Sequence, residues 1–166
     1  MTLSTAPAPE GAPEPATVTF SDFGLHPDVL KAVTAAGYTK PTPIQAKAIP
    51  VVMAGHDVMA AAQTGTGKTA GFALPIINAL MPSASHSASP ARHPVRALII
   101  APTRELADQI HDNVKTYIQF TPLRSAAVFG GVDMQPQTNA LRAGVEILIA
   151  TPGRLLDHVQ QKSVNL

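Results

Sequence analysis

The sequence predicts an α/β fold in which a parallel β-sheet is covered by helices on both faces. Short apolar segments alternate with longer segments whose apolar residues recur at helical spacing, the pattern of repeated strand–helix–strand units. The apolar segments contain few polar residues, as expected of strands that are buried on both sides. With 166 residues, the chain is long enough for one domain with a core of its own.

The first 19 residues are predicted to form a disordered tail. Ala, Pro and Thr dominate this stretch, so it cannot bury enough apolar surface to offset the entropy of ordering. Its start, "MTLSTAPAPE", has neither the basic nor the apolar region of a secretory signal. Residues 20–166 are therefore expected to contain the folded domain.

Two helices are expected at the start of this domain. Pro27 suits the first position of a helix, and Gly37 suits its C-terminal cap. Thr42 is a plausible N-cap for a second helix that begins at Pro43. Pro50 is expected to kink or end this second helix, because proline cannot donate the backbone hydrogen bond.

Strands and helices alternate through the rest of the chain. Residues 82–94, "PSASHSASPARHP", are instead predicted to form a solvated polar loop with no packing signal. The expected strands are residues 57–62, 96–101, 125–129 and 145–150, and the expected helices are residues 69–80, 103–120, 134–144 and 153–161.

Composition narrows the classes of function only slightly. The chain has no cysteine, which excludes disulfides and thiolate metal sites, and no apolar run long enough for a membrane span. The net charge is +1, but residues 1–30 hold four of the 11 acidic residues and none of the 12 basic ones. The mild basic excess of the remaining chain is weak support for a polyanionic partner. We expect a cytoplasmic protein without a membrane partner.

A glycine-rich segment, "AAQTGTGKT", follows the predicted strand 57–62 and leads into a predicted helix. Its end matches a phosphate-binding P-loop, but Ala62 stands where the strict pattern has the first glycine. Gly65 and Gly67 would let backbone N–H groups surround phosphate oxygens, Lys68 would add charge, and Thr69 would reach Mg²⁺. The alternative is a glycine-rich turn with a solvated lysine.

An adenine-binding residue is suggested by "GYTKPTPIQ", residues 37–45. Glutamine can pair with both N6 and N7 of adenine, whereas guanine offers two acceptors at that edge. Gln45 could therefore select adenine, and Phe20 or Phe23 could stack on the base. On the residues alone, a solvated glutamine and a core phenylalanine remain the alternatives.

Taken together, "FSDFGLHPDVLKAVTAAGYTKPTPIQ" and "AAQTGTGKT" resemble the start of a DEAD-box RNA helicase, close to the bacterial RhlE-type branch. The resemblance implies a RecA-like fold of the P-loop NTPase class, in which Gln45 reads adenine, Phe20 stacks on it and Phe23 lies in the core. It also makes the P-loop lysine and threonine catalytic, with Mg²⁺ held through the nucleotide by the threonine. The implied ATP-binding residues are Phe20, Gln45, Ala62, Gln63, Thr64, Gly65, Thr66, Gly67, Lys68 and Thr69.

Three further stretches match the same family in order: "PTRELA", a "GG" pair with Gln137 beyond it, and "TPGR". Each follows a predicted strand, at the edge where open α/β sheets bind ligands. Their hydroxyls, glycines and arginines suit sequence-tolerant contacts with an RNA backbone, although each could singly be an ordinary turn or helix start. The implied RNA-binding residues are Pro102, Thr103, Arg104, Gly130, Gly131, Thr151, Gly153 and Arg154.

The Asp-Glu-Ala-Asp motif of the family does not occur in the 166 residues. We therefore expect the N-terminal portion of a first helicase domain, one that binds nucleotide but does not hydrolyse ATP by itself. The scattered histidines suggest no metal site beyond nucleotide-bound Mg²⁺. Two other interpretations remain open: a different P-loop motor, such as a DNA helicase, and a non-catalytic RNA-binding or adaptor module.

Overall fold

Three parallel strands form the sheet at the centre of the computed structural model, which describes residues 17–63 and 67–166. They are β1 (Ala97–Ile100), β2 (Ser125–Val128) and β3 (Ile147–Ala150), in the order β1-β3-β2. Ile100 and Val128 both pair with Ala150. The carboxyl ends of all three strands therefore meet at one edge of the sheet.

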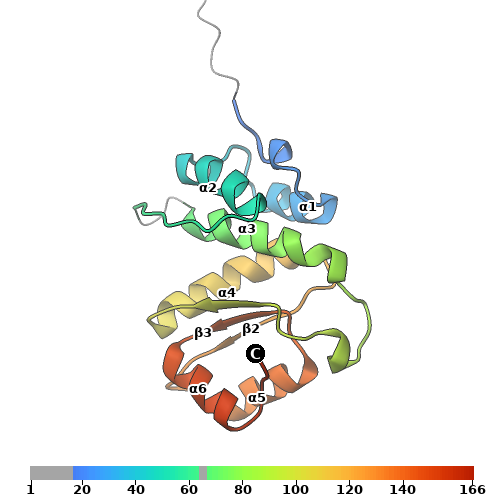
Figure 1. The fold of residues 1–166 in the computed structure, drawn as a ribbon, viewed down its shortest axis with the longest axis vertical. Coiled ribbons are helices and arrows are strands. Elements are labelled where there is room, and N and C mark those ends of the chain that lie inside the picture. The colour runs from blue at the N-terminus through green and yellow to red at the C-terminus, as the bar shows by residue number, and fades with distance from the viewer. Residues whose placement is uncertain (1–16, 64–66) are drawn as a thin grey trace, which may run out of the picture.

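Helices cover both faces of this sheet, which confirms the predicted fold class (Figure 1). Helix α4 lies against one face, α3 packs on α4, and α1 and α2 form an outer layer, while α5 and α6 lie on the opposite face. The α-helices are α1 (Pro27–Ala35), α2 (Pro43–Met53), α3 (Lys68–Leu80), α4 (Arg104–Ile118), α5 (Met134–Ala143) and α6 (Pro152–Gln160), and three 3₁₀ turns are η1 (Phe20–Phe23), η2 (Met81–Ser83) and η3 (Pro90–Arg92).

The alternation of side chains along β3 divides the core into two layers. Ile147 and Ile149 join the cluster that contains residues of α1, α3 and α4. Leu148 and Ala150 point the other way, into the cluster with residues of α5 and α6. All four side chains are fully buried, so β3 is the central strand that the run of apolar residues predicts.

Residues 57–62 do not form the predicted strand. They have no regular structure, and Val58 and Met59 are 42% and 102% exposed. A strand needs a neighbour to complete its backbone hydrogen bonds, and the strand pairs in the described residues are only β1–β3 and β2–β3. Strand β1 lies at one end of the strand order, and its Leu98 and Ile100, which point to the same face of the sheet, are 40% and 49% exposed, so β1 is an apolar edge strand.

The prediction that Pro50 kinks or ends the second helix is wrong as to the ending. Helix α2 continues through Pro50 to Met53, and Ala54 N donates to the Pro50 carbonyl at 3.0 Å. Proline cannot donate a backbone hydrogen bond at this position, and packing of α2 against α3 offsets that loss. Pro75 is accommodated in the same way inside α3.

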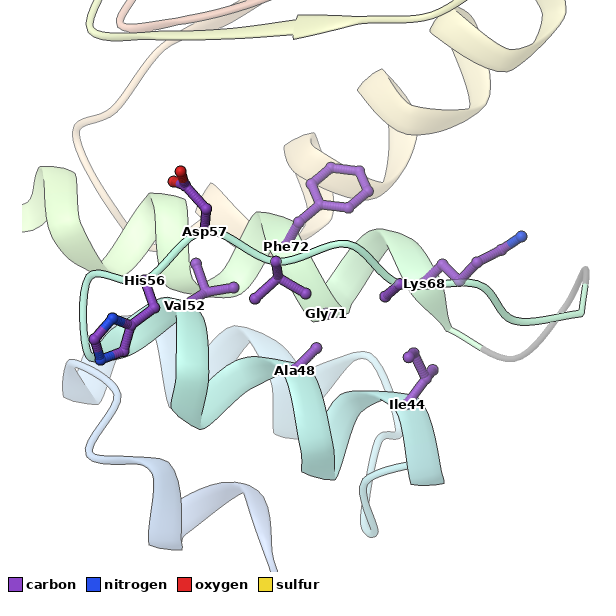
Figure 2. Close-up of a pocket in the computed structure, with 10 residues that line it drawn as sticks. Ile44, Ala48, Val52, His56, Asp57, Lys68, Gly71 and Phe72 are labelled. Carbon is purple, nitrogen blue, oxygen red and sulfur yellow. The ribbon is translucent and has the colours of Figure 1, made fainter.

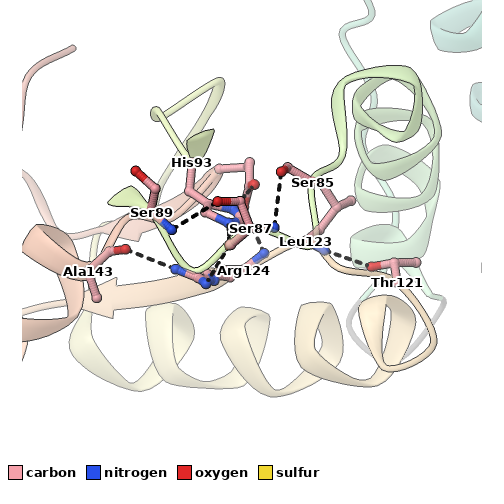
Figure 3. A network of polar contacts seen from close by, with 9 residues as sticks. Ser85, Ser87, Ser89, His93, Thr121, Leu123, Arg124 and Ala143 are labelled. Atoms are coloured by element: carbon pink, nitrogen blue, oxygen red, sulfur yellow. Dashed lines mark hydrogen bonds and ion pairs between the residues drawn. The ribbon is translucent and has the colours of Figure 1, made fainter. Parts of the chain in front are cut away.

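Most residues of segment 82–94 are exposed, as expected of a polar loop, but the segment is anchored to the sheet through His93 (Figure 3). His93 is only 2% exposed, and its ring contacts the Glu146 carboxylate, which is fully buried at the start of β3. The other ring nitrogen of His93 lies 2.7 Å from the Ser87 carbonyl. The polar composition of the segment gave no sign of this anchor in the sequence, and the partner Glu146 lies 53 residues away.

Thr19, the last residue of the predicted tail, caps the first turn: its backbone N–H donates to Asp22 at 2.7 Å. The rest of the predicted tail, up to residue 16, lies outside the described residues. Among the described residues, no helix combines the length and the apolar character that a membrane crossing requires.

Candidate nucleotide and RNA-binding sites

A pocket of about 500 Å³ gathers the predicted adenine reader and the end of the P-loop. Three segments line it: the stretch before and at the start of α2, the first turn of α3, and one side of α4. Helix packing brings them together, because α3 contacts both α2 and α4. The lining residues are Tyr38, Lys40, Thr42, Gln45, Gly67, Lys68, Thr69, Ala70, Leu106, Gln109, Asn113 and Tyr117.

Gln45 has a structural role that the sequence interpretation missed. It is the third residue of α2, and its Oε1 accepts the backbone N–H of the N-cap residue Thr42 at 2.9 Å, while the Thr42 hydroxyl accepts the Gln45 N–H. This is a capping box, and its signal was present in the sequence as Thr-x-x-Gln. Gln45 Nε2 also donates to the Gly67 carbonyl at 3.2 Å, which ties α2 to the P-loop.

The amide of Gln45 still has capacity to bind a base. One lone pair of Oε1 and one hydrogen of Nε2 remain after these two contacts. An acceptor beside a donor complements the N6 amino group and N7 of adenine, whereas the O6 of guanine would face the Gln45 acceptor. The side chain is 3% exposed, so its orientation is held by the fold before any ligand binds.

Gly67 is required by both its conformation and its neighbours. Its φ of 80° is in the left-handed region, and a Cβ atom there would lie 2.2 Å from Gln45 Nε2. Gly67 is the N-cap of α3, whose first residues are Lys68 and Thr69. A glycine turn, a helix N-terminus, a lysine and a hydroxyl on one side of a pocket fit a phosphate chain and its bound cation.

Two tyrosines line the pocket, Tyr38 and Tyr117, and the more exposed one is Tyr38, which sequence reasoning did not single out. Phe20 is 3% exposed and does not line the pocket; its ring centroid lies 6.2 Å from that of Tyr38. Tyr38 is 39% exposed, and its hydroxyl lies 3.3 Å from that of Tyr117. Burial and this hydrogen bond raise the pKa of Tyr117 above its ordinary value, so it stays neutral. Stacking of Phe20 on a base stays a prediction.

Of the remaining P-loop positions, the structure describes Ala62 and Gln63. Both have no regular structure and do not line the pocket. The predicted contacts of Thr64, Gly65 and Thr66 lie outside the described residues.

A second cavity, of about 430 Å³, lies on the other side of the P-loop lysine (Figure 2). Ile44, Ala48 and Val52 of α2 and Phe72 of α3 form its aliphatic and aromatic walls. Segment 56–60 passes over it, where the predicted strand does not form. We assign no ligand to this cavity.

The three predicted RNA-binding stretches lie at one edge of the sheet, directly after β1, β2 and β3. Thr103 caps α4 by accepting the Leu106 N–H at 3.2 Å. The Arg104 guanidinium lies 5.4 Å from the centre of the Phe129 ring. Gly131 has a φ of 80°, and a Cβ there would lie 3.2 Å from Arg104 Nη1. The structure thus brings the "PTRELA" and "GG" stretches together.

Arg154 is mostly occupied within the protein. Both Nη atoms donate to the Val132 carbonyl at 3.2 Å, Nη1 donates to Gln137 Oε1, and the side chain is 13% exposed. Thr151 is the N-cap of α6, and its hydroxyl makes no capping hydrogen bond. Pro102, Gly130 and Gly153 are exposed. Arg154 therefore joins the "TPGR" and "GG" stretches, and Arg104 is the more accessible charge.

We expect the protein to lose stability as the pH falls below about 6.5. Burial lowers the pKa of His111 and of His158 below the ordinary value of 6.5, so the folded chain binds fewer protons there than the unfolded chain. Stability linked to these residues is present above the unfolded pKa and decreases between the unfolded and the folded pKa. Urea unfolding between pH 7.5 and pH 5 measures it, and a smaller decrease in His111→Gln and His158→Gln identifies the groups.

No group of three or more acidic, histidine or cysteine side chains in the described part of the chain could hold a metal ion.

A RecA-like α/β domain whose P-loop helix and basic loops lie beside a parallel sheet is the architecture of a P-loop nucleotide-binding protein. The chain belongs to the DEAD/DEAH box helicase family, whose model matches residues 42–166.

Named relatives are similar over most of this chain. The DEAD-box ATP-dependent RNA helicase RhpA of Helicobacter pylori (strain B128) is 47% identical over 146 residues, which cover 88% of this chain and 28% of RhpA. The ATP-dependent RNA helicase RhlB of Hamiltonella defensa is 46% identical over 147 residues, covering 89% and 35%. The chain therefore spans about a third of the length of these relatives.

A DEAD box protein from the hyperthermophile Methanococcus jannaschii has a similar fold. Its crystal structure superposes with a TM-score of 0.76 at 36% identity, over 89% of this chain and 38% of that one. The family is thus confirmed by sequence and by fold. Assignment to the RhlE-type branch stays a prediction, since these relatives carry the names RhpA and RhlB.

Proposed function

We propose that the chain is the N-terminal portion of the first RecA-like domain of an ATP-dependent RNA helicase, one that acts on RNA in the cytoplasm. The observation that carries this proposal is the single pocket in which Gln45 lies beside Gly67, Lys68 and Thr69. An adenine reader and a phosphate-binding turn are thereby held together by a direct hydrogen bond. Family membership and the names of the relatives support ATP and RNA as ligands.

In this proposal Gln45 selects adenine through the free donor and acceptor of its amide. Tyr38 offers an accessible aromatic surface among the lining residues, and the buried ring of Phe20 packs next to Tyr38. The division of roles between the two aromatic residues differs from the stacking expected for Phe20. It follows from the burial of Phe20 and the exposure of Tyr38.

The phosphates would lie at the N-terminus of α3. Lys68 supplies positive charge to the outer phosphates, and the helix N-terminus contributes free N–H groups. Thr69 presents a hydroxyl to the cation that accompanies the nucleotide. A bound Mg²⁺ would neutralise phosphate charge there. Residues 62–66 would complete the turn around the phosphates.

RNA would bind along the carboxyl edge of the sheet, through exposed Arg104, the glycine turn at Gly130 and Gly131, and the start of α6 at Thr151 and Gly153. Charge, hydroxyls and backbone N–H groups recognise phosphates and sugars, so binding should tolerate many sequences. In the whole protein, ATP and RNA together would drive local separation of RNA strands. The chain alone is proposed to bind these ligands without hydrolysing ATP.

Calorimetric titration of the chain with Mg·ADP and with Mg·GDP tests the nucleotide half of the proposal. We expect ADP to bind and GDP to bind at least about 5-fold more weakly, from the discrimination of one bidentate contact. Lys68→Ala should weaken both nucleotides, since it acts on phosphates and not on the base. Equal affinities for ADP and GDP would remove the adenine assignment. Robust RNA-stimulated ATP turnover by the purified chain would contradict its proposed inactivity.

Arg104→Ala tests the RNA half. Because Arg104 is exposed at the proposed interface, its loss should weaken binding of a labelled oligouridylate and reduce the slope of log affinity against log salt by about 1. Fluorescence anisotropy at several salt concentrations measures both quantities. Arg142→Ala is the matched control, an exposed arginine in the last turn of α5, and should leave the slope close to that of the unsubstituted chain.

A further inference from the structure

Gln137 is a buried glutamine that joins three parts of the proposed RNA-binding edge. It is 8% exposed and lies in the first turn of α5. Its Nε2 donates to the Phe129 carbonyl at 3.0 Å, directly before the glycine turn. Its Oε1 lies 3.2 Å from Arg154 Nη1 and 3.1 Å from His158 Nε2.

These contacts determine which nitrogen of His158 carries the proton. The Phe129 carbonyl only accepts and Arg154 only donates, so the amide of Gln137 can have only the orientation described. Its Oε1 accepts but cannot donate. His158 Nε2 must therefore be the donor, and a neutral ring then carries its lone pair on Nδ1.

The surroundings of His158 favour this neutral ring. The side chain is fully buried, and Nδ1 has no hydrogen-bond partner among the described residues. A proton on Nδ1 would create a buried N–H without an acceptor. The charged groups that act on the ring are Arg154 and Asp157 of its own helix, while α5 presents the uncharged Gln137. Burial and Arg154 lower the pKa of His158, and Asp157 opposes them.

We propose that His158 is a positioning residue of the RNA-binding edge: its neutral Nε2–H form holds Gln137, and Gln137 in turn holds the glycine turn and, through Arg154, the start of α6 in place for RNA. The inference rests on the proposed function, because it assumes that RNA binds at the carboxyl edge of the sheet. His158 touches neither the turn nor a ligand. It acts through one hydrogen bond to Gln137.

Protonation of His158 would then weaken RNA binding indirectly, through Gln137. The protonated ring keeps its Nε2–H, but it adds a charge beside Arg154 and a donor without an acceptor. The hydrogen-bonded arrangement that links Gln137, Arg154 and the Val132 carbonyl would then be less stable than arrangements in which these contacts are broken. RNA affinity should therefore have a component that decreases as the pH falls below 6.5, in addition to effects of exposed histidines.

Histidine-ring ¹⁵N NMR of the purified chain tests the arrangement without any ligand. We expect the Nε2–H tautomer for His158 and a titration midpoint below 6.5. Gln137→Met, which removes donor and acceptor at similar volume, should raise the Nδ1–H fraction of His158. His111 is the matched control, because its ring contacts Ser125 and not Gln137, and its signals should not change. A dominant Nδ1–H tautomer in the unsubstituted chain overturns the inference.

Binding of a labelled oligouridylate tests whether His158 supports RNA binding. His158→Leu should bind it about 2- to 10-fold more weakly, from the loss of one buried hydrogen bond, while Gln137 Oε1 keeps its contact with Arg154. His158→Gln, which can again donate to Gln137, should recover much of the affinity and lack the pH-dependent component. Mg·ADP affinity should stay unchanged in both variants, which shows that they are folded.

The outcomes separate the two proposals. An unsubstituted chain that binds ADP but no RNA overturns the RNA half of the proposed function, and this inference with it. If the unsubstituted chain and the His158→Leu variant bind RNA equally well, with the same pH profile, the inference alone is overturned. If His158→Leu does not fold, the comparison of His158→Gln with the unsubstituted chain across pH decides.

Discussion

Gln45→Ala is expected to abolish the preference of the chain for ADP over GDP and to lower ADP affinity by about 5- to 100-fold. The substitution removes both atoms that would pair with adenine, a contact of about 1–3 kcal/mol. It also removes the acceptor for the Thr42 N–H and the donor to the Gly67 carbonyl. The free energy of unfolding should therefore fall by about 1–2 kcal/mol as well.

Gln45→Glu separates these two effects. Glutamate keeps an oxygen that can accept the Thr42 N–H, so the capping box survives. It lacks the Nε2 donor and would place a second oxygen against the Gly67 carbonyl and against N7 of adenine. We expect lost ADP selectivity by calorimetry with the contact to the Thr42 N–H retained, while urea unfolding should show a loss of stability that comes from the oxygen facing the Gly67 carbonyl and not from the cap. A Gln45→Glu variant that still prefers ADP would contradict adenine recognition by this residue.

His93→Ala is expected to destabilise the domain by about 3–5 kcal/mol. It leaves the Glu146 carboxylate buried without its main partner, and removing one member of a buried pair costs about that much. The Ser87 carbonyl would also lose its contact with the ring. Because whole domains are stable by only about 5–15 kcal/mol, the effect should be visible as a lower urea midpoint and a lower melting temperature.

The hydrogen-bond network around His93 explains why its loss should destabilise the domain so strongly (Figure 3). Glu146 Oε2 accepts the Arg124 backbone N–H at 2.8 Å, so the carboxylate also fixes the chain before β2. The Arg124 guanidinium donates to Ala143 and Ser87 carbonyls at 2.9 and 3.2 Å. One buried carboxylate therefore connects segment 82–94 with the starts of β2 and β3.

His86→Ala is the control for this experiment. His86 is an exposed histidine of the same segment, and its replacement should change stability by less than about 0.5 kcal/mol. If His93→Ala is equally mild, segment 82–94 is not anchored by the buried pair. The nucleotide pocket contains none of these residues, so folded His93→Ala protein should keep its affinity for ADP.

Local features that the sequence predicts correctly have local causes. Thr42 caps its helix as predicted, because a hydroxyl before a helix satisfies free N–H groups in the first turn of that helix. The apolar run before residue 151 forms a central strand because its side chains must be buried on both faces. The family motifs could also be recognised from the sequence, since each occupies a short continuous stretch.

Features that the sequence predicts wrongly or leaves open depend on distant partners. Residues 57–62 have the composition of a strand but not a neighbour in the described sheet, and backbone pairing cannot be judged from one segment. Tyr38 was overlooked because only the packing of α2, α3 and α4 shows which aromatic ring lines the pocket and which one lies beneath it.

The sequence by itself determined the α/β class, the helix starts and the order of the phosphate and RNA motifs along the chain. These depend on period, capping and residue type within a few positions. Only the tertiary structure decided the polar partnerships: Gln45 with Gly67, His93 with Glu146, and Gln137 with His158. They join residues 22, 53 and 21 positions apart, and strand order and helix packing, not local pattern, bring such groups within hydrogen-bonding distance.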